Sequence, residues 1–375
     1  MKKNVKNIIL KLLLFLMVSS TLLSCEREID RIRKANDDRP IMSARSNENE
    51  TLETTVEIET ETEIESIIES ATESETTGIE ETTADKEIYA FDLESAKARR
   101  EERRRKIENE GDPNSIEEIE IRMDDTFLYA TYSVIYEGSA KLYKVGKNVP
   151  NYKGKTIAIN AGHGTKNGEL YKTFSHPDFS PKVAGGTTTE GNVLSFAISE
   201  GTRFLDGGRE DEANLMIAIL LKDKLLKDGY SVLMIREDNN SSLDNIARCV
   251  IANEYSDAHV AIHFDSTTND KGIFYVIPKN YGNYLNMEPL KSNYDNIIKL
   301  GQSIIEAYRS LEMKIWKSSG TLDGDLTLFS YSVVPCVNIE LGDRATVFTE
   351  EKINKLVDGL KLGIDMFFND ESQSE

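Results

Sequence analysis

Cysteine and histidine are both scarce in this chain of 375 residues, which contains three cysteines and four histidines. Cys25 lies in the N-terminal segment, so only Cys249 and Cys336 remain for the rest of the chain. Two cysteines that lie far apart in sequence do not make a disulfide framework. Both lie within apolar helix or strand patterns, and we therefore expect them to be small, buried hydrophobic residues.

The chain also lacks an apolar run long enough to span a membrane at its hydrophobic N-terminus. A basic start leads into an apolar stretch that Lys11 and a polar Ser-Ser-Thr keep short. This pattern is typical of a secretory signal peptide, which we assign to residues 1–24. Leu22-Leu23-Ser24-Cys25 resembles the bacterial lipoprotein signal, in which Cys25 becomes the lipidated first residue. We expect a lipid anchor in the bilayer, at the outer face of the bacterial cell membrane. An ordinary signal peptide is the alternative.

Basic residues are absent from Ser46 to Asp85, where glutamate recurs among threonine, serine and isoleucine. Like charges at every second position would face one another on a strand, so this composition favours disorder. We expect residues 25–115 to be a disordered acidic tether with a basic helical end over 95–110. That end is either a solvated charged helix or a basic collar that meets anionic lipid or an anionic wall polymer. The net charge of −20 argues against nucleic acid as a partner.

Strand and helix patterns alternate from Lys155 onward, which predicts an α/β fold with a central mixed sheet flanked by helices. We assign residues 151–370 to one domain. Gly229 is expected to stop its first helix, and Ser241 or Ser242 to cap the second. Residues 116–150 carry short β-like runs, and we expect a small β-type segment or linker there, for instance part of an SH3-like wall-binding module.

Histidine and glutamate side chains stand at the ends of several predicted elements. His163 and His263 end apolar strand patterns, Glu340 ends another, and Glu210 begins a helical pattern. Strand ends and helix starts on one edge of an open α/β sheet form the crevice where ligands bind. Two imidazoles and one carboxylate are the protein ligands of a catalytic zinc site that keeps a fourth position for water. A further carboxylate nearby would serve as general base, so the pattern predicts a zinc hydrolase.

The same residues carry a resemblance to a known family. Motifs over roughly 155–370 resemble the type 3 zinc-dependent N-acetylmuramoyl-L-alanine amidases: AGHG (161–164), EDEANLMIA (210–218), IAR…AN (246–253), AIHFDS (261–266) and VPCVNIELG (334–342). The resemblance implies that His163, Glu210 and His263 bind Zn²⁺. It implies that Glu340 is the catalytic residue. The implied reaction is hydrolysis of the amide that joins N-acetylmuramic acid to L-alanine in peptidoglycan, and we expect a monomer.

The chain departs from the pattern of that family in three places. Asn160-Ala161 replaces the usual Asp-Pro, and Asp265 stands where asparagine is usual. Neither change removes a ligand; Asp265 and Asp343 are candidate partners that orient the ligands. The third departure is a long insertion, residues 170–209, where the family commonly has a short loop. We expect it to overhang the metal cleft, either as a lid or as an extra hairpin that stabilises the sheet edge.

Several residues have competing interpretations. Glu212 is the rival of Glu210 for the metal, but Asn214-Leu215 sets the register in favour of Glu210. His176 in the insertion is expected to be a surface or loop-packing residue. His259 is expected to be a satisfied core histidine and not a fourth ligand.

Two other functions fit the same residues. A zinc metallopeptidase that acts on wall stem peptides would use the same ligands and differ in the walls of its cleft. A non-catalytic cell-wall-binding protein with this fold would usually lack the late glutamate or a ligand. All four residues are present here, which counts against the non-catalytic alternative.

Overall fold

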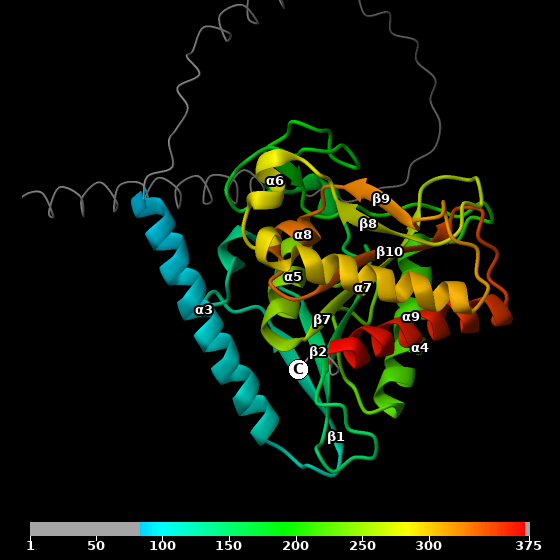
Figure 1. The fold of residues 1–375 in the computed structure, drawn as a ribbon, viewed down its shortest axis with the longest axis horizontal. Coiled ribbons are helices and arrows are strands. Elements are labelled where there is room, and N and C mark those ends of the chain that lie inside the picture. Colours follow the sequence, from blue (N-terminus) through cyan, green and yellow to red (C-terminus); the bar gives the residue numbers. More distant parts are fainter. Residues whose placement is uncertain (1–82, 372–375) are drawn as a thin grey trace, which may run out of the picture. The chain divides into compact units, whose positions relative to one another are not determined.

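The computed structural model describes residues 83–371, and their side chains from 95 to 370. The predicted signal peptide, Cys25 and most of the predicted tether lie outside the described residues. Helix α3 (Thr83–Asn109) comes first, and from Ala96 onward the chain forms one compact unit (Figure 1). None of the helices described here is long and apolar enough to cross a membrane.

An eight-stranded mixed sheet lies at the centre of this unit, in the order β1-β2-β6-β3-β7-β10-β8-β9. Strands β6, β3, β7 and β10 run parallel, whereas β8 is antiparallel to β10 and β2 is antiparallel to β6. This confirms the predicted α/β class. The strands are β1 (Ile116–Arg122), β2 (Ser139–Val145), β3 (Thr156–Ala161), β6 (Ser231–Met234), β7 (Ala258–Asp265), β8 (Phe274–Pro278), β9 (Thr321–Gly324) and β10 (Cys336–Asp343).

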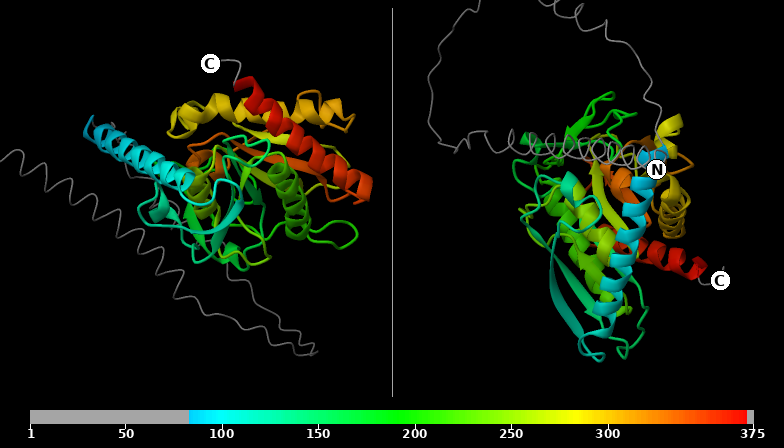
Figure 2. Two further views of the ribbon diagram at one scale, coloured as in Figure 1. Left: turned by 90° about the horizontal axis from the view of Figure 1, so that it is seen from below. Right: turned by 90° about the vertical axis from the view of Figure 1, so that its left-hand side faces the viewer.

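Helices cover both faces of the sheet. One face carries α4 (Glu210–Lys227), α7 (Leu290–Ser310) and α9 (Glu350–Glu371), and α7 and α9 lie side by side (Figure 2). The other face carries α5 (Asn245–Tyr255) and the short α8 (Thr327–Tyr331), while α6 (Gly282–Asn286) precedes α7. Because the parallel strands are covered on both sides, their sequences are nearly continuous apolar runs.

Alternating side chains of β3 show how this core is divided. Ile157 and Ile159 pack toward α4, Ala158 packs toward α5, and all three are fully buried. Complete burial of an isoleucine side chain is worth about 1.5–3 kcal/mol. Cys249 and Cys336 are buried and unpaired in the same core, as predicted.

Residues 116–150 are not a separate segment. β1 pairs with β2, and β2 pairs with β6 of the central sheet. The predicted β-type character of this stretch is confirmed, but the boundary predicted at 150 is wrong, because β2 belongs to the same sheet as the strands that follow. The β-like character of the stretch was visible in its sequence, but the partner strand lies about ninety residues later, where no local pattern can point to it.

The basic end of α3 packs on the same unit. Arg103 forms an ion pair with Glu254 and lies 4.6 Å from the centre of the Phe127 ring. Arg104 pairs with Asp257 at 2.5 Å. Of the two alternatives for this stretch, neither a solvated helix nor a lipid-facing collar describes these arginines, because acidic residues at the end of α5 bind them. The compact unit thus begins at Ala96 and not at 116.

Two predicted helix ends have different outcomes. Gly229 follows the end of α4 in a left-handed conformation (φ +88°), as expected for a stop. Helix α5 is capped by Asp244, whose Oδ1 accepts from the amide of Ala247 at 2.8 Å, and not by Ser241 or Ser242. Asp244 Oδ2 also accepts from the amide of Val134 at 2.7 Å. The two oxygens of this carboxylate thus serve both segments at once.

The insertion contains an antiparallel hairpin of β4 (Lys172–Phe174) and β5 (Leu194–Phe196), next to the single turn η2 (Gly168–Leu170). Its His176 is fully buried and lies 3.0 Å from Asp325, beside Lys182. His176 is therefore a packing residue and not a surface one. This buried polar contact ties the hairpin to the segment between β9 and α8.

Candidate metal centre

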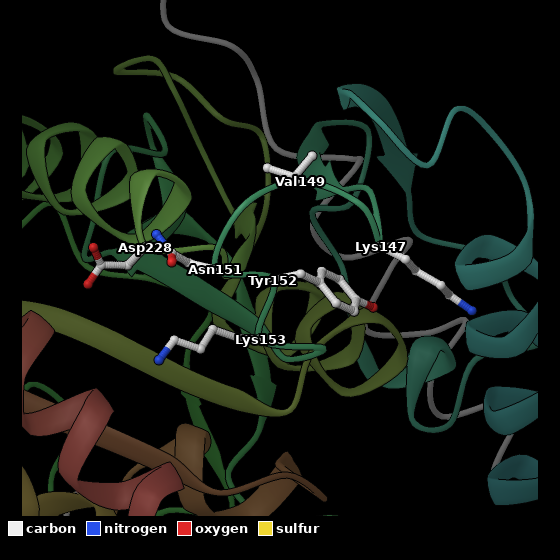
Figure 3. Close-up of a pocket in the computed structure, with 6 residues that line it drawn as sticks. All are labelled: Lys147, Val149, Asn151, Tyr152, Lys153 and Asp228. Carbon is white, nitrogen blue, oxygen red and sulfur yellow. The ribbon is translucent and has the colours of Figure 1, made fainter.

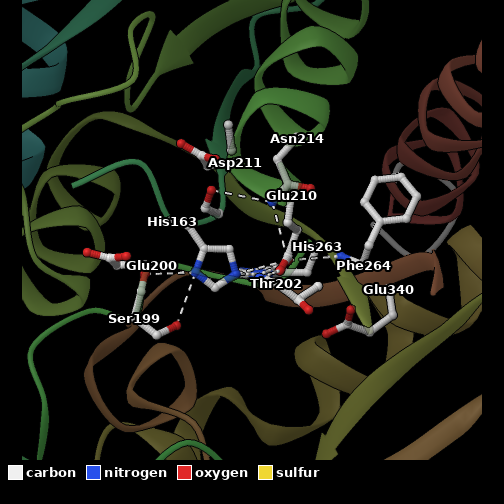
Figure 4. A network of polar contacts seen from close by, with 12 residues as sticks. His163, Ser199, Glu200, Thr202, Glu210, Asp211, Asn214, His263, Phe264 and Glu340 are labelled. Carbon is white, nitrogen blue, oxygen red and sulfur yellow. Dashed lines mark hydrogen bonds and ion pairs between the residues drawn. The ribbon is translucent and has the colours of Figure 1, made fainter. Parts of the chain in front are cut away.

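Four elements bring the predicted residues to one edge of the sheet (Figure 4). His163 follows the carboxyl end of β3, Glu210 is the first residue of α4, and His263 lies near the end of β7. One ligand atom from each of these three side chains lies within 4.8 Å of the others. Glu340 lies on the neighbouring strand β10. The structure thus brings the three predicted metal ligands and Glu340 to the same edge of the sheet.

The donor atoms of this set suit a cation. His163 Nε2 is 2.9 Å from Glu210 Oε1, and His263 Nδ1 is 3.1 Å from His163 Nε2 and 3.3 Å from Glu210 Oε1. On its other side, the Nδ1 of His163 lies 2.9 Å from the carbonyl oxygen of Ser199, which can only accept a hydrogen bond. A neutral His163 ring therefore carries its proton on Nδ1 and presents a lone pair on Nε2 toward the carboxylate. A divalent cation fits between these acceptors.

Glu210 is held in its ionised form. Its side chain is almost fully buried, which by itself favours the neutral acid, but His163 and His263 outweigh burial and hold the pKa well below its usual range. Oε1 accepts from the amide of Phe264 at 3.1 Å and Oε2 from the amide of Thr202 at 2.8 Å. The rival Glu212 is exposed on the helix and contacts only Arg209, at 3.9 Å, among ion pairs described here.

Two buried arginines fix the backbone at His163, which adopts a left-handed conformation (φ +62°). Arg248 donates to the carbonyls of His163 at 2.6 Å and Ala161 at 3.1 Å. Arg236 donates to the carbonyls of Ala161 at 2.8 Å and Gly162 at 2.9 Å. Burial lowers the pKa of Arg248 to about 9 and that of Arg236 to about 10, so both remain charged at neutral pH.

The sequence alone predicts no role for either arginine. Arg248 belongs to the IAR motif that contributes to the family resemblance, but nothing in a motif says which atoms a side chain meets. The one further signal is Asn160, which replaces the usual aspartate and accepts from Arg248 at 3.0 Å.

Glu340 presents a carboxylate oxygen that has no hydrogen-bond partner among the described residues. It is partly buried, and its Oε1 accepts from the side-chain Nδ2 of Asn338 at 3.4 Å. The oxygen without a described partner is Oε2. Burial, followed by the nearby charges of Glu210 and Asp265, raises the pKa of Glu340 well above its usual value.

The other candidates stand outside the ligand group. Asp265 pairs with Lys271 at 2.7 Å, and Asp343 accepts from the amide of Asn269 at 2.9 Å. These contacts pin the loop after β7, and no hydrogen bond of either carboxylate to His163, Glu210 or His263 occurs in the described chain, so their role as partners of the ligands stays a prediction. His259 is a fully buried core residue as expected, but its ring nitrogens have no partner in the described part of the chain. Burial lowers its pKa to about 3.

An open surface hollow of about 630 Å³ lies elsewhere on the molecule (Figure 3). Most of its lining residues precede β3, whereas His163 follows that strand, so the hollow opens at the opposite strand ends. It contains none of the candidate site residues. It is lined by Lys147, Val149, Asn151, Tyr152, Lys153 and Asp228.

A comparison with models of known protein families assigns this chain to a family. A family model described as N-acetylmuramoyl-L-alanine amidase matches residues 157–365, which is more than half of the chain and includes the three clustered side chains and Glu340. The chain belongs to this family. It is an enzyme of the N-acetylmuramoyl-L-alanine amidase class, whose substrate is the peptidoglycan of the cell wall. A comparison with curated proteins found no match.

Several solved amidase structures are similar to this chain. The amidase Ami1 from Mycobacterium smegmatis is 17% identical, with a TM-score of 0.47, over 59% of this chain and 99% of that one. The apo form of Ami1 from Mycobacterium abscessus is 20% identical, with a TM-score of 0.46, over 57% and 99%. The CwlD amidase from Clostridioides difficile, solved in complex with the GerS lipoprotein, is 18% identical, with a TM-score of 0.40, over 57% and 98%.

The matched region begins inside β3 and ends inside α9 of this amidase. Helix α3, the edge strand β1 and its neighbour β2 precede it. These elements nevertheless pack on the amidase sheet, so in this chain the folded unit is larger than the family match.

Proposed function

We propose that this amidase binds Zn²⁺ through His163, Glu210 and His263 and hydrolyses the amide between N-acetylmuramic acid and L-alanine in peptidoglycan. The observation that carries the proposal is the convergence of two ring nitrogens and one ionised carboxylate oxygen within 4.8 Å, beside a carboxylate that has a free oxygen. Two imidazoles and one carboxylate form a ligand set of catalytic zinc sites.

Bound zinc would supply a Lewis acid that polarises the scissile carbonyl and acidifies water. The protein supplies the proton transfers. Glu340 accepts the proton of the attacking water and passes it to the departing amide nitrogen, because an amine leaves poorly without protonation. Asn338 holds one oxygen of Glu340 and leaves Oε2 available for this transfer.

Product analysis tests the reaction. The purified protein is loaded with zinc and incubated with defined muropeptides, and the products are separated by mass. Intact stem peptide together with peptide-free muramic acid supports the amidase. Cleavage within the stem peptide would instead identify a metallopeptidase with the same ligands, and no cleavage by zinc-loaded protein would point to a wall-binding role.

We also infer that the protein is a monomeric lipoprotein held at the outer face of the cell membrane through Cys25. Support comes from Leu22-Leu23-Ser24-Cys25 after a basic and apolar start. Cys25→Ala should move the protein out of the membrane fraction or leave it as unprocessed precursor. Normal processing and detergent-dependent membrane retention of this variant would contradict the lipid anchor. Light scattering of the unit without its leader would test the monomer.

A further inference from the structure

The end of the insertion reaches two of the three candidate ligands. We call residues Ser199–Thr202 the support segment. The carbonyl of Ser199 accepts from His163 Nδ1 at 2.9 Å, and its hydroxyl lies 3.1 Å from the same nitrogen. The amide of Thr202 donates to Glu210 Oε2 at 2.8 Å (Figure 4). One short stretch thus contacts ligands that come from β3 and α4.

Gly201 brings the backbone of the support segment against both ligands. A Cβ atom at this position would lie 2.7 Å from His163 Cδ2 and 3.0 Å from Glu210 Oε2. Both distances are shorter than an ordinary contact of such an atom, and Gly201 has a φ of +83°, which side chains rarely adopt. Only glycine allows this approach without displacing a ligand.

The support segment is fixed at its base. The preceding residues Ala197 and Ile198 are buried. The amide of Ala197 donates to the carbonyl of Tyr171 at 3.0 Å, and its carbonyl accepts from the amide of Asn245 at 3.1 Å. The buried contact of His176 with Asp325 holds the hairpin before it. These contacts favour a fixed support over the lid considered from the sequence.

We propose that the support segment is a positioning element for the metal site. It holds His163 in the tautomer that leaves Nε2 free and holds Glu210 with Oε1 turned toward the two imidazoles. Loss of such outer partners of metal ligands typically weakens metal affinity 10- to 100-fold. This inference rests on the proposed zinc site and adds a role for the insertion in building it.

A matched pair of glycine variants tests the proposal. Gly201→Ala introduces both a strained φ and a collision with the ligands. Gly191→Ala introduces a comparable strain in the same insertion (φ +87°), but its Cβ would meet nothing within 4 Å. Zinc affinity is measured by competition with a chromophoric chelator, and thermal unfolding is followed without metal. We expect affinity about 10- to 100-fold weaker for Gly201→Ala and unchanged for Gly191→Ala.

The outcomes separate this inference from the proposed function. If the wild type binds no zinc, the metal site itself is wrong. If the wild type binds zinc and both variants bind it equally well, only the positioning role is wrong. If Gly201→Ala fails to fold, the proposal is tested instead on the metal-free wild type, by finding which ring nitrogen of His163 carries the proton. Nitrogen NMR with labelled histidine should show the proton on Nδ1, and a proton on Nε2 would overturn the proposal.

Discussion

Glu340 lies directly opposite His263 in the parallel register between β10 and β7. Strand pairing therefore places a carboxylate beside a candidate metal ligand without any hydrogen bond between the two side chains among the described contacts. The antiparallel neighbour of Glu340 on its other side is Phe274, which is fully buried. The carboxylate thus stands between a polar site and an apolar wall, and its environment favours taking up a proton.

Glu340→Gln tests this arrangement. The substitution keeps the shape of the side chain and removes only its ability to accept a proton. We expect turnover of muropeptides to fall about 10²- to 10⁴-fold, while zinc content and melting temperature stay near wild type. Near-normal turnover would contradict the assignment of Glu340 as general base and would leave Asp265 or Asp343 as the candidate proton acceptor.

A pair of glutamate variants on the first turn of α4 tests the ligand assignment. Glu210→Ala removes a buried carboxylate that faces both imidazoles, so purified protein should retain no stoichiometric zinc. Glu212→Ala is the matched control, because that side chain is 56% exposed and its nearest ion-pair partner described is Arg209 at 3.9 Å. Elemental analysis of both proteins gives the answer. Metal loss from the Glu212 variant alone would mean that the helix register is misassigned.

Much of the site was predictable because each residue stands at the end of a local pattern. The apolar runs before His163 and His263 and the helical pattern after Glu210 define the same sheet edge from the sequence alone. What supports these ligands was not predictable. The carbonyl of Ser199 and the amide of Thr202 act through backbone atoms, so their residue types carry no signal, and their position depends on the path of a long insertion.

Strand pairing shows the same limit of prediction from the sequence. The pairing of β2 with β6 joins residues far apart in sequence, and a short β-like run cannot reveal its partner. The cap of α5 shows a different limit. The sequence predicts Ser241 or Ser242, whereas Asp244 caps the helix and also accepts from the amide of Val134, which comes from another segment.

Arg248→Met should destabilise the protein strongly. The side chain is fully buried, and its guanidinium donates to Asn160 Oδ1 and to the carbonyl of His163, so methionine would fill part of the volume and leave these two oxygens without that donor. Each buried acceptor left unsatisfied costs about 1–3 kcal/mol, and we expect a total loss above about 3 kcal/mol in urea unfolding. Arg122→Met is the control, because this side chain is 65% exposed on β1. Equal stability of the two variants would contradict the proposed role of Arg248 in holding the backbone at His163.

Asp325→Asn tests how firmly the insertion is held. Asp325 is almost fully buried and accepts from His176 at 3.0 Å and from the amide of Val183 at 2.7 Å. Burial opposes its ionisation, but the hydrogen bond from His176 and the charge of Lys182 lower its pKa below the usual value. Removing one partner of a buried charged pair typically costs about 3–5 kcal/mol. We expect a loss of that size in urea unfolding at pH 7.

The sign of the pH dependence follows from the lowered pKa of Asp325. A carboxyl whose pKa is lower in the folded state stabilises the protein above its unfolded pKa, about 3.9 for aspartate, and loses this effect as pH falls through the folded value. The stability gap between wild type and Asp325→Asn should therefore be widest near pH 7 and narrow below about pH 4. Asp323→Asn is the matched control, because it removes the same charge from an exposed residue of β9 and should show no such gap. A gap that is absent at pH 7, or that widens in acid, would mean that the contact of His176 with Asp325 does not anchor the insertion.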